Sequence, residues 1–207
     1  MDKAQETILE IDLKTLKQNF TFLKSKTTAN TKFLAVVKAF AYGSDAVEIA
    51  KYLQDLDVDY FAVAYSYEGV ALRDAGVTKP ILVLHPQPVN FDTIIKRCLE
   101  PSMYSKRILE TFIACAEKHK QTNYPVHIKF NTGLNRLGFW HTDIPKIISD
   151  LKETNHVKVQ SIFSHLAASE DLDEHDFSIN QINNFAYIAQ QFYKHLGYEP
   201  MLHILNT

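Results

Sequence analysis

Short apolar runs recur along this chain of 207 residues, and their spacing limits the folds that it can adopt. Each run has the length and the aliphatic or aromatic content of a strand, and most stretches between the runs carry apolar residues at helical spacing. The runs lie at 33–37, 60–64, 81–84, 101–104, 126–130, 157–163 and 201–205. Parallel strands need helical crossovers of this kind, so the alternation predicts a parallel α/β fold.

The stretches between the runs place apolar residues on one face of a helix, at intervals of three and four residues. These faces start at Leu13, Val47, Val70, Ile108, Ile144 and Ile182. Glycine and proline mark the element boundaries, at Gly76, Pro80, Pro101, Pro125 and Gly197. Because no Ser-rich or Gly-rich linker divides the chain, residues 1–207 are predicted to form one α/β domain.

About seven strands in alternation come close to the eight of a (β/α)8 barrel, and the competing fold is a doubly wound open sheet. Polar residues that follow the predicted strands favour the barrel: Lys38, Arg136, His165 and Thr207. Barrel enzymes place their chemistry at this end of every strand, whereas an open sheet uses it only near its switch point. No segment has the glycine pattern of a nucleotide-binding loop.

Composition excludes several classes of protein. The formal net charge is −2, without the basic excess that a nucleic-acid surface needs. No apolar run is long enough to span a bilayer, and residues 1–6 lack the pattern of a secretory signal, so we expect a cytoplasmic protein that contacts no membrane. Cys98 and Cys115 lie in stretches expected to be helical and are predicted to be reduced structural thiols.

Lys38 stands directly after the apolar run 33–37. Burial on both faces is expected for that strand, so the lysine emerges where the strand ends. A partly desolvated amine has a lowered pKa and is nucleophilic enough to form a Schiff base, most often with pyridoxal phosphate. The alternative is a lysine whose ammonium simply reaches solvent.

The string from Ala35 to Gly43, Ala-Val-Val-Lys-Ala-Phe-Ala-Tyr-Gly, resembles the cofactor-lysine motif of alanine racemases. That motif usually reads A-V-V-K-A-N-A-Y-G-H-G, so Phe40 replaces the asparagine and Ser44-Asp45 replaces His-Gly. Three more segments resemble the family in the same order, at 127–139, 163–171 and 203–207. Asn131 departs from the family, which usually has aspartate there. The resemblance covers essentially the whole chain and implies a barrel domain that binds pyridoxal phosphate.

By this resemblance, Lys38 holds the cofactor as an aldimine and then serves as one of two acid/base groups at the substrate Cα. Tyr42 donates its hydroxyl to the cofactor phosphate, with ordinary packing as its alternative. Asn206 and Thr207 match the family's phosphate-binding segment, although Thr207 is the last residue and chain ends fray.

Arg136 is implied to contact the cofactor and the substrate carboxylate, and its alternative is a surface arginine. Lys129 needs neutralisation if it points inward, and in many family members this lysine is carbamylated and steadies the arginine. His165 is implied to lie close to the cofactor ring, with a core histidine bonded to backbone as its alternative. The replacement at Asn131 puts the detailed hydrogen bonding in doubt.

No metal site is predicted from the sequence. The acidic run 170–176 lies between a predicted strand and a predicted helix, where a solvated loop is expected. None of the nine histidines forms an H-x-x-x-H pair.

Alanine racemases are longer than this chain, so the resemblance implies a truncated barrel that lacks its closing strand and a C-terminal β domain. The missing part is implied to carry the arginine that faces the pyridine nitrogen and the tyrosine that is the second acid/base, contributed across a homodimer. The fragment is therefore expected to be inactive alone, and to self-associate through strand edges at 33–37 and 201–205 unless residues 7–11 cover a gap.

The resulting prediction is a bacterial amino-acid racemase that converts L-alanine to D-alanine for peptidoglycan. The first alternative is a single-domain barrel that carries pyridoxal phosphate without racemising. A second and weaker alternative is a decarboxylase of the same barrel type. The sequence does not exclude small amino acids other than alanine as substrates.

Overall fold

The computed structural model describes residues 7–204. Contacts between Cα atoms divide the chain into two compact units, Met1–Leu84 and His85–Thr207. Within each unit the strands are parallel and neighbouring strands follow sequence order. Each unit thus has the βα succession that the spacing of apolar runs predicts.

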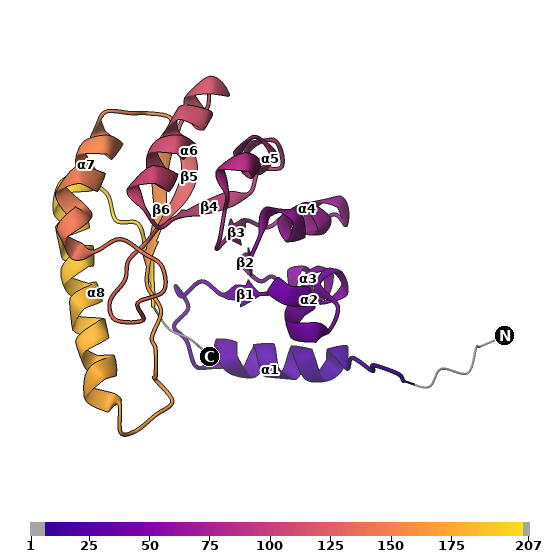
Figure 1. Ribbon diagram of the computed structural model, residues 1–207. Coiled ribbons are helices and arrows are strands. Elements are labelled where there is room, and N and C mark those ends of the chain that lie inside the picture. The colour runs from indigo at the N-terminus through magenta and orange to yellow at the C-terminus, as the bar shows by residue number, and fades with distance from the viewer. Residues whose placement is uncertain (1–6, 205–207) are drawn as a thin grey trace. The chain divides into compact units, whose positions relative to one another are not determined.

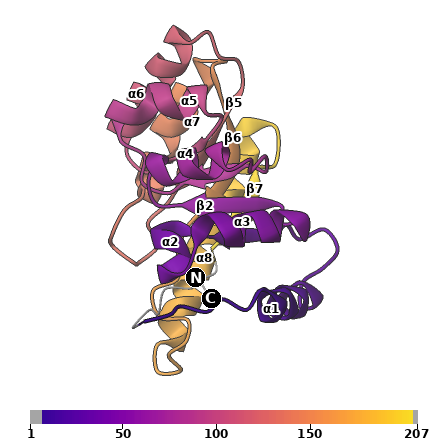
Figure 2. The same ribbon diagram turned by 90° about the vertical axis from the view of Figure 1, so that its right-hand side faces the viewer.

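The first unit contains a helix ahead of three strands, and helices connect those strands. Its elements are α1 (Leu13–Ser25), β1 (Leu34–Val36), α2 (Lys38–Gly43), α3 (Ala46–Asp55), β2 (Tyr60–Val63), α4 (Ser66–Asp74) and β3 (Ile81–Val83). Ala35 pairs with Phe61, and Ala62 pairs with Leu82. The helices α3 and α4 lie side by side in both views (Figures 1 and 2).

The second unit contains four strands, which alternate with helices. Its elements are η1 (Pro88–Asn90), α5 (Phe91–Lys96), β4 (Glu100–Met103), α6 (Lys106–Lys118), β5 (Tyr124–Lys129), η2 (His141–Asp143), α7 (Ile144–Lys152), β6 (Val157–Phe163), α8 (His175–Leu196) and β7 (Met201–His203). The helices α7 and α8 pack against each other (Figure 1). All seven apolar runs therefore contain strands, and within the described residues the strand ends differ from the predicted ones by at most two residues.

Side chains from central strands form the core of each unit. Every residue of β2 and β3 is buried, as expected for parallel strands that are covered on both faces. In the second unit Phe130 is fully buried and meets Phe192 of α8 edge to face, with ring centroids 5.5 Å apart. Aromatic burial of this kind contributes much of a core's stability.

Two expectations for the buried elements are wrong. The strand β1 is not buried on both faces: Leu34 and Ala35 are half-buried and Val36 is 38% exposed. In the described residues β1 pairs only with β2, so it has the partial burial of an edge strand. Cys98 is not helical, because α5 ends at Lys96 and Cys98 adopts a positive φ of 51° in the turn that follows.

The expectation for the acidic run is confirmed. Residues 170–176 are all exposed, and α8 begins only at His175, so most of the acidic run is a solvated loop. Between residues 7 and 204 no helix combines the length and the apolar character that crossing a membrane requires. Ile8 and Leu9 are exposed, in a segment without strand structure.

Strand edges in both units predict self-association. Within residues 7–204, β7 pairs only with β6, and Leu202 on β7 is 43% exposed. Unpaired backbone groups beside apolar side chains recruit further strands, and a lysine at such an edge opposes this. We expect the chain to associate with increasing concentration, and Leu202→Lys to weaken this association at least threefold, as measured by sedimentation. Leu172→Lys, in the exposed loop, is the matched control; a strictly monomeric wild-type chain contradicts the prediction.

Candidate functional site

The residues after β1 form a left-handed turn that presents Lys38. Ala39, Phe40, Ala41 and Tyr42 have φ between 51° and 59° and ψ between 40° and 53°, which is left-handed helical geometry. For residues other than glycine this conformation costs about 1–2 kcal/mol each, because Cβ approaches the following carbonyl oxygen. Four strained residues in succession need stabilising contacts.

Glu68, the third residue of α4, supplies those contacts. Its Oε1 accepts a hydrogen bond from the backbone N–H of Ala39 at 2.7 Å. Its Oε2 accepts from the N–H groups of Ala64 at 2.7 Å and Tyr65 at 2.9 Å. One carboxylate thus ties the turn after β1 to the end of β2 and the start of α4. Hydrogen bonds to a charged acceptor contribute roughly 1.5–3 kcal/mol each, enough to offset much of the strain.

Backbone hydrogen bonds complete the turn. The N–H of Val37 donates to the carbonyl of Ala62 at 2.9 Å, which extends the β1–β2 pairing to the residue before Lys38. The N–H of Ala41 donates to Val37 at 3.1 Å, and that of Ser44 donates to Phe40 at 2.7 Å. The position of the Lys38 Cα is therefore fixed by the sheet on one side and by the turn on the other.

The structure brings Lys38 and Tyr42 together. Lys38 Nζ lies 5.9 Å from the centroid of the Tyr42 ring. Lys38 is half-buried, whereas Tyr42 is 70% exposed, so its hydroxyl is accessible to a ligand. Beside the turn, an apolar hollow of about 450 Å³ is lined by Val37, Phe40, Val63, Tyr67, Ala71 and Leu72 among others.

In the second unit, Lys129 and Arg136 lie at the carboxyl end of β5. Lys129 is the last residue of this strand and 7% exposed, with its Nζ 5.7 Å from the Phe163 ring centroid. Arg136 is exposed on the loop that follows. Lys129 is thus buried at the end of β5, in a strand whose residues are buried on both faces.

Asn131 organises the loop that carries Arg136. Its Oδ1 accepts hydrogen bonds from the N–H groups of Gly133 at 3.1 Å and Asn135 at 2.9 Å, and its Nδ2 donates to Asn135 Oδ1 at 2.9 Å. The turn needs only an acceptor at Oδ1, which an aspartate also offers. The amide of Asn131 adds one more hydrogen bond, because its Nδ2 donates to Asn135 Oδ1. The loop is thus compatible with the replacement of the family's aspartate.

The same loop returns so closely to β5 that only glycine fits at position 138. A Cβ on Gly138 would lie 2.6 Å from the backbone N of Asn131 and from the carbonyl carbon of Phe130, and φ is 132°. Phe139 donates its N–H to Lys129 O at 2.9 Å and accepts from Asn131 N–H at 2.9 Å. These two hydrogen bonds join Phe139, after the loop, to Lys129 and Asn131, before it, so both ends of the loop that contains Arg136 are held together.

A buried polar network connects the loops of Arg136 and His165. Gln181, fully buried on α8, donates through Nε2 to Thr132 Oγ1 at 3.3 Å and to the His165 carbonyl at 3.2 Å. Thr132 Oγ1 also lies 2.8 Å from Ser164 Oγ, which donates to the Phe130 carbonyl at 2.8 Å. The sequence analysis missed Gln181, although a glutamine on the otherwise apolar face of 182–192 was a usable signal.

A second buried chain of polar groups crosses β4, β5, β6 and β7. His127 Nε2 lies 2.8 Å from Glu100 Oε2, and its Nδ1 lies 2.6 Å from Ser161 Oγ. Ser161 Oγ lies 3.2 Å from Nε2 of His203, whose ring stacks on Phe163 at 4.7 Å. Burial, with a smaller contribution from His127, lowers the pKa of His203 to about 3. Sequence reasoning did not connect these residues, because only strand pairing brings them together.

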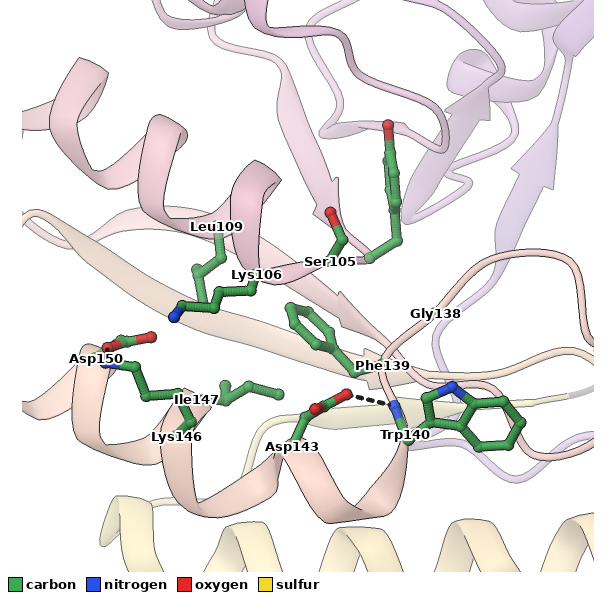
Figure 3. Close-up of a pocket in the computed structure, with 11 residues that line it drawn as sticks. Ser105, Lys106, Leu109, Gly138, Phe139, Trp140, Asp143, Lys146, Ile147 and Asp150 are labelled. Atoms are coloured by element: carbon green, nitrogen blue, oxygen red, sulfur yellow. Dashed lines mark hydrogen bonds and ion pairs between the residues drawn. The ribbon is translucent and has the colours of Figure 1, made fainter.

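Another hollow, of about 250 Å³, lies between the beginnings of α6 and α7 (Figure 3). Its lining includes Leu109, Phe139 and Ile147, and Asp143 accepts a hydrogen bond from the Trp140 N–H at 2.8 Å there. None of the predicted site residues within 7–204 lines this hollow. The predicted Asn206 and Thr207 lie outside the described residues.

Known proteins resemble this chain in sequence. The family model "Alanine racemase, N-terminal domain" matches residues 11–207. The alanine racemase of Thermodesulfovibrio yellowstonii is 35% identical over 201 residues, which cover 96% of this chain and 53% of that protein. The alanine racemase of Fusobacterium nucleatum is 36% identical over 97% of this chain and 54% of its own length. The chain thus spans about half the length of these curated relatives.

Solved structures of alanine racemases also resemble this chain. A Clostridium difficile alanine racemase in complex with cycloserine has a TM-score of 0.87 and 29% identity, over 93% of this chain and 53% of that one. The alanine racemase of Corynebacterium glutamicum has a TM-score of 0.82 and 27% identity, over 94% and 54%. The predicted fold class, an incomplete (β/α) barrel, is confirmed rather than the doubly wound sheet.

The Glu68 contacts predict a local effect of mutation. Glu68→Ala removes the acceptor of three backbone N–H groups, so the left-handed turn loses its anchor. We expect hydrogen exchange at the amide of Ala39 to accelerate at least tenfold, and the free energy of unfolding to fall by about 2–3 kcal/mol. Glu48→Ala is the control, because this exposed carboxylate makes only a 3.7 Å ion pair with Lys51. Equal exchange at Ala39 in both variants contradicts the assigned role.

The lowered pKa of His203 predicts a pH dependence of stability. The unfolded chain takes up this proton near pH 6.5, whereas the folded chain resists it until about pH 3. Stabilisation present above pH 6.5 is therefore lost as the pH falls toward 3, by up to about 1.4 kcal/mol per pH unit. Urea unfolding between pH 7 and 5 should show a shallower slope for His203→Gln than for wild type. The control His195→Gln, at an exposed position, should keep the wild-type slope; an unchanged slope in His203→Gln contradicts this account.

Proposed function

Because the chain belongs to the family of the alanine racemase N-terminal domain, we propose that it forms the cofactor-binding part of an amino-acid racemase that uses pyridoxal phosphate. The observation that carries the proposal is the left-handed turn after β1, which holds Lys38 at the carboxyl end of a parallel strand. Barrel enzymes assemble their active sites at that end. We propose further that residues 1–207 act as one barrel domain.

The residues of the turn fit the proposed cofactor. Lys38 is half-buried, so part of the residue stays exposed to solvent. Its backbone is fixed through Val37 and through Glu68, which limits the motion of the attachment point. The exposed hydroxyl of Tyr42 is available to donate to a phosphate group. A rigid attachment point and a nearby donor are what a covalently held phosphate ester requires.

When bound, pyridoxal phosphate supplies an electron sink that makes the Cα proton of an amino acid acidic. Lys38 Nζ would hold the cofactor and would take or return the proton at the substrate Cα. Tyr42, Asn206 and Thr207 bind the phosphate. These roles are assigned by family membership.

Residues of the second unit are proposed to serve the same cofactor and substrate. Arg136 binds the substrate carboxylate through its planar guanidinium, and His165 steadies the cofactor ring through hydrogen bonds. Lys129, buried at the end of β5, is proposed to be carbamylated: its neutral amine adds to carbon dioxide and releases a proton to water, which replaces a buried cation by an anion able to steady Arg136. The loop closure by Gly138 and Asn131 supports a fixed position for Arg136.

Racemisation needs one group that removes the Cα proton on one face and another that delivers a proton on the opposite face. Lys38 provides one of them. The second is proposed to lie in the remainder of a family-length protein and to be contributed across a homodimer. The proposed reaction converts L-alanine to D-alanine in the bacterial cytoplasm, for use in peptidoglycan. A pyridoxal phosphate carrier of the same barrel type is not favoured, because the relatives named above are alanine racemases.

The proposal predicts which lysine reacts. With excess pyridoxal phosphate, borohydride reduction should attach the cofactor to Lys38, and peptide mapping by mass spectrometry should find this label abolished in Lys38→Ala. Lys32→Ala, which removes an exposed lysine just before β1, should keep the label on Lys38.

In a family-length protein, Lys38→Ala should lower the interconversion of L- and D-alanine by at least a thousandfold, whereas the chain 1–207 alone should show none. Labelling of a different lysine overturns the proposal.

A further inference from the structure

Three side chains with metal-binding atoms meet on the helical surface of the second unit. They are Asp92 on α5, Cys115 on α6 and His119 at the end of α6. The carboxylate oxygen, the thiol sulfur and the imidazole nitrogen all lie within 4.8 Å of one another. Cys115 and His119 are four residues apart, so they share one face of the helix. None of these residues takes part in the proposed racemase site.

Present contacts already orient the carboxylate of Asp92 toward the imidazole of His119. Asp92 Oδ1 lies 2.5 Å from His119 Nε2 and 3.2 Å from Lys118 Nζ. Hydrogen bonds from His119 and then from Lys118 hold the pKa of Asp92 below its ordinary value. All three residues are half-buried, which is open enough for an ion to enter from solvent.

We propose that Asp92, Cys115 and His119 bind a divalent ion of the zinc class, with water as the fourth ligand. Sulfur, imidazole nitrogen and carboxylate oxygen together are the ligand set of tetrahedral zinc, at bond lengths of about 2.0–2.3 Å. Tetrahedral bonds of that length place ligand atoms roughly 3.3–3.7 Å apart, within the separation that the cluster allows. The His119–Asp92 contact has to open by less than about 1 Å, which side-chain rotation provides.

Binding is balanced by the loss of protons. The ion bonds to the thiolate of Cys115, and the thiol proton goes to water. Before binding, His119 Nε2 carries the proton that it donates to Asp92; on binding, this proton is exchanged through water to Nδ1, which leaves the Nε2 lone pair for the ion. Burial, and then the charge of Asp92, raises the pKa of the Cys115 thiol, so the ion has to displace this proton. Lys118 competes for the same carboxylate, which limits the affinity.

Cobalt titration tests the site directly, because Co²⁺ substitutes for Zn²⁺ and a thiolate ligand gives it an intense charge-transfer band in the near ultraviolet. The chain, reduced without a thiol reagent and kept free of oxygen, should bind one equivalent with that band, and added Zn²⁺ should remove it. Cys115→Ser should abolish the band, whereas His119→Gln and Asp92→Asn should each weaken binding at least tenfold.

Two controls separate this site from any other thiol or any surface carboxylate. Cys98→Ser should retain the band, since Cys98 is exposed and lies outside the cluster. Lys118→Ala should tighten Co²⁺ binding severalfold, because it removes the ammonium that shares Asp92. Circular dichroism of each variant confirms that it is folded. Absence of the band in the wild-type chain, its survival in Cys115→Ser, or its loss in Cys98→Ser overturns the proposal.

Discussion

The Glu68 carboxylate is the contact on which the rest of the candidate site depends. It accepts hydrogen bonds from three backbone N–H groups that belong to the turn after β1, to the end of β2 and to the start of α4. Without an anchor, four left-handed residues in succession are unfavourable by several kcal/mol, since each costs about 1–2 kcal/mol. Because the anchor is a charged group on a rigid helix, the turn and Lys38 keep one position relative to β1.

In the second unit, a glycine and two amide side chains hold the loops in place. Gly138 lets the loop of Arg136 return to within contact of β5, and Asn131 closes the turn inside it. The buried amide of Gln181 then joins this loop to that of His165. In both units, side-chain hydrogen bonds to backbone groups hold the loops at the carboxyl ends of parallel strands: Glu68 accepts such bonds in the first unit, and Gln181 donates one in the second. Strands and helices thus supply the rigidity, and the loops supply the chemistry.

The sequence predicted the strands well, because apolar runs of strand length have few alternatives when helices separate them. It also placed Lys38 correctly at a strand end. The left-handed turn was not predictable, since Ala39–Tyr42 contains no glycine and local preference opposes it. Its cause, Glu68, is remote in sequence and acts only after β1 and β2 pair. The helix expected around Cys98 was wrong, because α5 ends two residues before it, at Lys96. The sequence did not indicate the cluster of Asp92, Cys115 and His119, because its carboxylate lies on a different helix, more than twenty residues away in the chain.

The central claim is that the Glu68 anchor holds Lys38 in the position that lets it bind the cofactor. The most direct measurement is the fraction of Lys38 that carries pyridoxal phosphate after borohydride reduction, compared between the wild-type chain and Glu68→Gln at the same cofactor concentration. Glutamine keeps the length and one acceptor but loses the charge and the second acceptor oxygen. The account predicts at least a fivefold lower labelled fraction in Glu68→Gln, with labelling unchanged in Glu48→Gln. Equal labelling of Lys38 in wild type and Glu68→Gln contradicts it.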